Sequence, residues 1–204
     1  FEIQYLLRTI KDLTFDNIYH EHVNYWCLLS ILHFFKDTGM KIYKVEEIDT
    51  HGGSLRVYAT MNKDKRAHKS LSKYIELEKK NKLDKIETYY KFANKVEHVK
   101  SLSFNKINEL SKEGKTIVGY GAPAKATTVL NYFGLNDKHI QYVIDDSEIK
   151  HNKYIPGVNI KIVYNNNEII NNVDFVIVLA WNFFDDIVKK NKPIFPKSQF
   201  IKLK

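Results

Sequence analysis

Residues 116–125 have the sequence TIVGYGAPAK, which decides the fold class of the second half of the chain. A short β-branched run leads into two glycines and a proline, as in a strand that turns tightly into a helix. The form G-x-G-x-x-A suits a loop whose backbone N–H groups approach a phosphate at a helix N-terminus. Gly119, Tyr120, Gly121 and Lys125 are therefore candidate phosphate-binding residues. The alternative is a tight turn without a ligand.

The sequence after this loop alternates short strands with helices, which predicts a Rossmann-like α/β domain over residues 115–204 with a mostly parallel sheet. We expect strands at 116–120, 140–144, 160–163, 173–180 and near Phe200, and helices at 123–133, near Glu168 and at 183–190. Asp145 ends the second expected strand, where dinucleotide-binding folds place an acid that binds the ribose. Spacing alone would make this a nicotinamide site, and the alternative is a polar loop after a buried strand.

The sequence before residue 115 is predicted to form two further parts of the chain. Residues 1–66 form a small α+β segment, and residues 67–114 form a connector of two long helices that meet near residues 81–84. Within the first part we expect helices at 4–13 and 28–38, an extended piece at 15–19, and strands at 40–48 and 54–60.

Composition excludes several classes of protein. The chain has 204 residues, of which 44% are hydrophobic, so disorder is excluded for the whole. A single cysteine, Cys27, excludes a disulfide scaffold and a cysteine-rich zinc site. No apolar run is long enough for a membrane span and no signal peptide is recognisable, so we expect a cytoplasmic protein without membrane contact. Because Phe1 opens what resembles the inside of an element, we expect a fragment of a longer protein.

The net charge of +8 lies mainly in residues 61–115, which hold 15 Lys and Arg against 8 Asp and Glu. A nucleic-acid footprint is one interpretation of this excess. The lysines are spread through a helical pattern, however, which favours a solvated helix face, and we expect no nucleic-acid partner.

The sequence Tyr-His-Glu-His at residues 19–22 places two imidazoles, a carboxylate and a phenol in four positions. A metal site would need a further ligand, and only Cys27 or His51 is nearby, so we expect no metal here. An acid–base role uses the imidazole, whose pKa lies near neutrality. In a strand His20 and His22 would share one face, whereas a turn would bring Tyr19 and His22 together. An ordinary polar loop is the alternative.

A third candidate site lies at residues 50–56, where a glycine turn leads into a strand that carries Arg56. Backbone N–H groups and the guanidinium could bind a phosphate. The alternative is a hairpin turn with one exposed arginine.

Taken together and in order, these segments resemble the C-terminal part of the sugar-nucleotide C-methyltransferases, which depend on S-adenosylmethionine. The matching pieces are FDNIYHEH at 15–22, HGGSLRV at 51–57, GYGAPAK at 119–125, YIPG at 154–157 and LAWNF at 179–183. The resemblance implies a three-part protein with an N-terminal zinc domain, a central domain that holds S-adenosylmethionine, and a Rossmann-like C-terminal domain. This chain would then begin near the end of the second part, and both the zinc and most of the cofactor site would lie outside it.

The reaction implied by the resemblance is methylation of a carbon beside the ketone of a nucleotide-linked 4-keto-deoxysugar. His22 matches the family's base, Tyr19 would position the sugar or donate to the enolate oxygen, and Glu21 would orient the site, which requires a turn at 19–22. His20 would be scaffold. Under this interpretation no nicotinamide is needed.

The same resemblance makes Arg56 and residues 119–125 candidates for the diphosphate of the sugar nucleotide, and the Asp145 region a candidate for its nucleoside. The alternative function is a non-catalytic nucleotide- or NAD-binding Rossmann module. The sequence leaves open the sugar, the carbon, the nucleotide and the oligomeric state.

Overall fold

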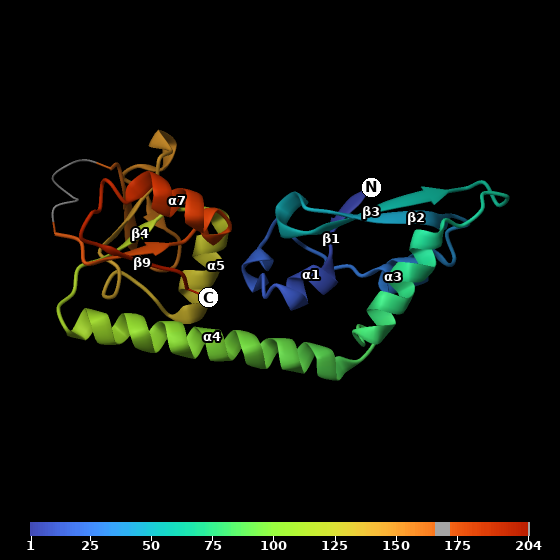
Figure 1. Cartoon of the computed structure of the whole chain (residues 1–204), viewed down its shortest axis with the longest axis horizontal. Helices are drawn as coiled ribbons and strands as arrows, with labels where there is room; N and C mark the ends of the chain where they lie inside the picture. The colour runs from blue at the N-terminus through green and yellow to red at the C-terminus, as the bar shows by residue number, and fades with distance from the viewer. Residues whose placement is uncertain (166–171, 204) are drawn as a thin grey trace. The chain divides into compact units, whose positions relative to one another are not determined.

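The computed structural model describes residues 1–165 and 172–203, and the helix expected near Glu168 lies outside the described residues. The chain divides into two compact units, residues 1–96 and 97–204. Helix α4 (Ile86–Lys112) contributes residues to both units. Each unit has its own sheet (Figure 1).

The first unit contains a three-stranded antiparallel sheet with the order β1-β3-β2. Its strands are β1 (Glu2–Gln4), β2 (Lys41–Ile48) and β3 (Ser54–Thr60). The two longer strands were predicted. The chain at β1 was expected to enter a helix at residue 4, and three residues are too few to show the alternation that marks a strand.

The helices that accompany this sheet include α1 (Leu6–Lys11), the 3-10 helix η1 (Phe15–Asn17), α2 (Leu28–Phe35) and α3 (Lys69–Lys80). The extended piece expected at 15–19 is wrong. The Asn17 N–H donates to the Thr14 carbonyl at 3.1 Å, and the Ile18 N–H donates to the Phe15 carbonyl at 2.9 Å. Asp and Asn favour such turns over strands, which explains the error.

The N-terminus of α2 is closed by a carboxylate from α3. Glu78 is completely buried, and its Oε1 and Oε2 accept hydrogen bonds from the N–H groups of Leu28 at 2.6 Å and Leu29 at 2.8 Å. These N–H groups have no partner within their own helix, and the positive end of the helix dipole favours a negative charge there. The buried carboxylate therefore fixes α2 against α3. Burial and this neighbouring charge raise the pKa of Tyr5, which stays protonated.

The second unit has the Rossmann-like architecture predicted from the sequence. Its six-stranded sheet has the order β6-β7-β5-β4-β8-β9 and is parallel except for β6. The strands are β4 (Ile117–Tyr120), β5 (Tyr142–Ile144), β6 (Tyr154–Ile155), β7 (Ile160–Val163), β8 (Phe175–Val178) and β9 (Gln199–Ile201). Helices α5 (Ala124–Phe133) and α7 (Phe184–Asn191) accompany them (Figure 1).

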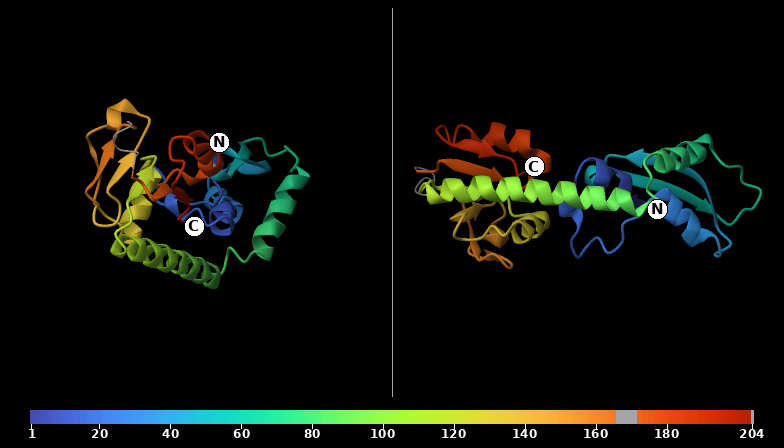
Figure 2. Two further views of the ribbon diagram at one scale, coloured as in Figure 1. Left: turned by 60° about the vertical axis from the view of Figure 1, so that its left-hand side comes forward. Right: turned by 90° about the horizontal axis from the view of Figure 1, so that it is seen from below.

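The two connecting helices expected between residues 67 and 114 are α3 and α4. Helix α3 packs on β2, and α4 is one uninterrupted helix of 27 residues (Figure 2). It ends before Gly114, whose φ of 75° provides the left-handed residue that commonly follows a helix. Among the described helices none is both long and apolar enough to cross a bilayer.

Candidate functional site

Residues 19–22 form a turn, as the family resemblance requires. The His22 N–H donates to the Tyr19 carbonyl at 2.9 Å, and the two rings meet edge to face with centroids 5.1 Å apart. The Tyr19 hydroxyl donates to Glu21 Oε2 at 3.0 Å. His20 also contacts the Tyr19 ring but is exposed, while Tyr19 and His22 are half-buried. The turn thus brings the phenol, one carboxylate and one imidazole together.

A cavity of about 440 Å³ adjoins this turn, and we call it the His22 cavity. It is lined by Glu2, Ile3, Gln4, Glu21, His22, Val23, Asn24, Trp26 and Ser54. The lining combines the turn with β1 and with the first residue of β3, where Gln4 pairs with Ser54 across the sheet. Segments about 50 positions apart in sequence therefore build one concave polar site beside the imidazole.

The protonation state of Tyr19 follows from its surroundings. Burial and the hydrogen bond to Glu21 raise the pKa of Tyr19 above its usual value of 10.0. The hydroxyl is therefore protonated at neutral pH. It can serve as a hydrogen-bond donor, whereas the imidazole remains the group able to accept a proton.

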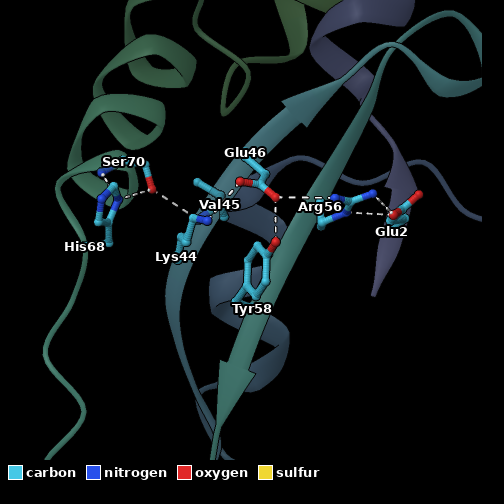
Figure 3. A network of polar contacts seen from close by, with 8 residues as sticks. All are labelled: Glu2, Lys44, Val45, Glu46, Arg56, Tyr58, His68 and Ser70. Atoms are coloured by element: carbon cyan, nitrogen blue, oxygen red, sulfur yellow. Dashed lines mark hydrogen bonds and ion pairs between the residues drawn. The ribbon is translucent and has the colours of Figure 1, made fainter.

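Arg56 is held between two carboxylates (Figure 3). Its Nε and Nη2 lie 2.7 and 2.6 Å from Glu2 Oε1, and its Nη1 lies 3.5 Å from Glu46 Oε1. A phosphate would have to compete with these carboxylates, so the predicted phosphate role of Arg56 stays a prediction. Because Glu2 lines the His22 cavity, Arg56 fixes one wall of that cavity in this structure.

Glu46 lies at the centre of this network and predicts a pH dependence. Its Oε1 accepts from the Tyr58 hydroxyl at 2.5 Å, and its Oε2 lies 2.9 Å from Lys44 Nζ (Figure 3). These contacts lower the pKa of Glu46 from 4.5 to about 2. A carboxyl with a depressed folded-state pKa adds stability that is present above the unfolded value, 4.5, and is lost as the pH falls toward about 2.

We therefore expect Glu46→Gln to be less stable than the wild type above pH 4.5, and the difference in free energy of unfolding to shrink as the pH falls toward about 2. Urea unfolding at successive pH values measures this difference. Tyr58→Phe removes the hydrogen bond that lowers the pKa of Glu46 most, so this variant should lose the stability contributed by Glu46 at a higher pH than the wild type does. Parallel curves for wild type and Glu46→Gln would contradict this expectation.

The glycine turn before β3 is the 3-10 segment η2 (Thr50–Gly52) followed by Gly53. Gly53 has a φ of 114°, and a Cβ there would lie 2.8 Å from Arg8 Cγ. Backbone geometry and the approach of Arg8 therefore explain this glycine without a ligand.

The glycine loop of the second unit is likewise explained by packing. A Cβ on Gly119 would lie 2.7 Å from Val143 Cγ2, and Gly121 has a φ of 85°. The Gly121 N–H donates to the Ile144 carbonyl at 2.7 Å, and the Ala122 N–H donates to Asp145 Oδ2 at 2.6 Å. Two N–H groups of the loop are thus bonded within the chain.

The other predicted residues of this unit differ in their accessibility. Asp145 is buried, and besides Ala122 it accepts from the Ser147 N–H at 2.9 Å and from Lys150 Nζ at 3.0 Å. This disfavours the ribose-binding role that the nicotinamide interpretation requires. Tyr120 is also buried, and its hydroxyl donates to Asp146. Lys125 is half-buried in the first turn of α5. The phosphate-binding roles stay predictions.

Sequence reasoning missed Glu2, Gln4 and Trp26 as parts of the site. They belong to no recognisable motif, and only the pairing of β1 with β3 and the fold of the turn bring them together. Within residues 1–165 and 172–203, no three His, Cys, Asp or Glu side chains are grouped so that they could hold a metal ion.

Comparison with known proteins gives two matches. Residues 49–202 match the family described as C-methyltransferase C-terminal domain. The chain is 30% identical over 192 residues to "C-methyltransferase NovU" of Streptomyces niveus, which covers 94% of this chain and 46% of that protein. The chain therefore spans about half the length of this curated relative. The family match begins after the turn at 19–22, so the turn is not part of it.

Proposed function

This chain belongs to the C-methyltransferase C-terminal domain family, and from this we propose that it is the substrate-activating part of an enzyme that methylates a carbon of a nucleotide-linked 4-keto-deoxysugar. The observation that carries the proposal is the turn that gathers Tyr19, Glu21 and His22 beside the His22 cavity. The similar Streptomyces protein is named a C-methyltransferase, which supports carbon as the methylated atom. The sugar-nucleotide substrate is proposed from the family resemblance of the motifs.

In the proposed reaction His22 is the base. A proton on the carbon beside the ketone passes to an imidazole nitrogen, and the electron pair of the broken C–H bond moves toward the ketone oxygen, which becomes an enolate. The Tyr19 hydroxyl stabilises that oxygen by donating a hydrogen bond. Because a hydroxyl has a single hydrogen, Tyr19 can donate to the substrate only after it releases Glu21. Glu21 thus holds the phenol close to the imidazole until the substrate arrives.

The methyl donor in this proposal is S-adenosylmethionine, which supplies an electrophilic methyl group on a sulfonium when bound. The His22 cavity suits a neighbouring cation, because Glu21 is a carboxylate and Trp26 adds an indole, while the charge of Glu2 is already paired with Arg56. We propose that the donor is held mainly by sequence outside this chain, as is the zinc that the family resemblance implies.

The second unit is proposed to contact the nucleotide diphosphate. Lys125 is the best supported of its candidate residues, since it is a partly accessible cation in the first turn of α5, where the helix dipole also favours an anion. Gly119, Gly121, Tyr120 and Asp145 would then shape the loop from inside. Arg56 would reach a phosphate only by leaving Glu2.

Solvent exchange tests this function directly. The complete methyltransferase is incubated in deuterium oxide with a thymidine-diphosphate-linked 4-keto-6-deoxyhexose and without S-adenosylmethionine, and deuterium at the carbon beside the ketone is followed by mass spectrometry. We expect deuterium to enter at that carbon, and a C-methylated product to form once S-adenosylmethionine is added. Methylation of an oxygen, or no exchange with any such sugar nucleotide, would contradict the proposal.

A further inference from the structure

Gln4 is a buried side chain in the wall of the His22 cavity whose hydrogen-bonding groups are unused. It ends β1 opposite Ser54 and is 8% exposed. Neither its Nε2 nor its Oε1 has a hydrogen-bond partner among the described residues. Such an amide has lost its bonds to water and gained none in return, so a group that supplies both a donor and an acceptor would be bound favourably.

The same stretch of chain holds further buried polar atoms without a partner among the described residues, on Thr9, Thr14 and Asn17. Native proteins keep few such atoms, and each calls for an explanation such as a functional role or a bound water or ion. Here they lie on the segment that runs from β1 to the turn at 19–22. The interior of this part of the first unit therefore holds more hydrogen-bonding groups than the described residues pair with one another.

The charge of the cavity restricts what can enter it. Its lining has two carboxylates, Glu2 and Glu21, and no lysine or arginine. The Ser54 hydroxyl already donates to the Thr50 carbonyl at 2.9 Å. Glu2 is paired with Arg56, so Glu21 is the lining carboxylate that remains without an ion pair among the described residues. Its charge disfavours an anionic group such as a diphosphate, whereas an uncharged group that carries hydrogen-bond donors is favoured. A hydroxyl group both donates and accepts, so it matches the carboxylates and the amide alike.

On the basis of the proposed function, we propose that Gln4 is a specificity-determining residue whose amide binds a hydroxyl of the sugar while His22 removes the neighbouring proton. Both amide atoms are shielded from water in this structure, so the sugar reaches them only after neighbouring side chains of the cavity wall move. This proposal explains the unpaired amide: its hydrogen bonds are missing in the free protein and are formed with the substrate.

The test is Gln4→Met in the complete methyltransferase, which keeps the volume and removes the amide. The KM for the thymidine-diphosphate-linked 4-keto-6-deoxyhexose should rise roughly 10-fold, as expected for one lost hydrogen bond. The Tm should stay the same or rise, because replacing an unpaired buried polar group by an apolar one is neutral or stabilising. The control is Thr14→Val, which removes another unpaired buried oxygen outside the cavity lining and should leave the KM unchanged.

The outcomes separate this inference from the proposed function. A lower Tm for Gln4→Met would show that the amide is already bonded in the free protein and would overturn the inference whatever the KM. An unchanged KM with an unchanged or higher Tm would mean that the amide makes no hydrogen bond to the substrate, which also overturns the inference. If His22→Gln abolishes turnover while Gln4→Met has no effect on KM, only this inference fails. If His22→Gln leaves turnover intact, the proposed function fails.

Discussion

Replacing His22 by glutamine is expected to lower the rate of deuterium exchange and of methyl transfer about 1000-fold, the usual contribution of a positioned base. Glutamine keeps most of the bulk of the imidazole but cannot accept the proton at neutral pH. Since His22 is only half-buried at the surface of the turn, the Tm should change little. Steady-state rates and solvent exchange in the complete enzyme measure the first effect, and thermal unfolding measures the second.

His20 is the matched control for this experiment. It is an imidazole two positions away that contacts the same Tyr19 ring from an exposed position and does not line the His22 cavity. His20→Gln should keep the rate within a few-fold of the wild type. Equal losses of rate for the two variants would indicate that the intact turn, rather than one base, is required. A larger loss for His20→Gln would mean that His20, and not His22, is the base.

Replacing Glu78 by alanine is expected to destabilise the first unit by about 3 kcal/mol, because two buried N–H groups at the start of α2 lose a charged acceptor together. Glu78→Gln should have a smaller effect, since the amide keeps one acceptor oxygen but turns a donor toward the other N–H. Urea unfolding followed by circular dichroism measures both variants.

Glu76 provides the comparison for Glu78, because it lies on the same helix and is exposed. Glu76→Ala should change the free energy of unfolding by no more than about 0.5 kcal/mol. If Glu78→Ala were equally mild, water would be able to reach the N-terminus of α2 and replace the carboxylate.

The fold of the second unit was predictable because local signals agree with each other there. Strand β4, the glycine turn and α5 follow one another within residues 117–133, and each of the three has a distinct composition. The first unit carries weaker signals. Strand β1 is three residues long, and η1 consists of Phe15, Asp16 and Asn17, whose apolar residue suggested a strand although the two polar ones favour a turn.

The geometry of the candidate site was predictable only where its residues are contiguous. Tyr19, Glu21 and His22 stand within four positions, so the motif pointed to them and the turn required by the resemblance is present. Arg56 and Gln4 depend on β1–β3 pairing, which sets Glu2 opposite Arg56 and Gln4 opposite Ser54. No local pattern could show that the guanidinium would be paired with carboxylates, or that the amide would be left unpaired.

The carboxylate cap of α2 also bears on how the chain folds during its synthesis. Glu78 follows Leu28 by 50 positions, so the ribosome completes α2 well before it adds the residue that caps it. At about 5 to 20 residues per second, the synthesis of these residues takes about 3 to 10 seconds, which is long compared with helix formation. Isolated helices as short as the eight residues of α2 are unstable in water, so α2 is expected to become persistent only after α3 has emerged.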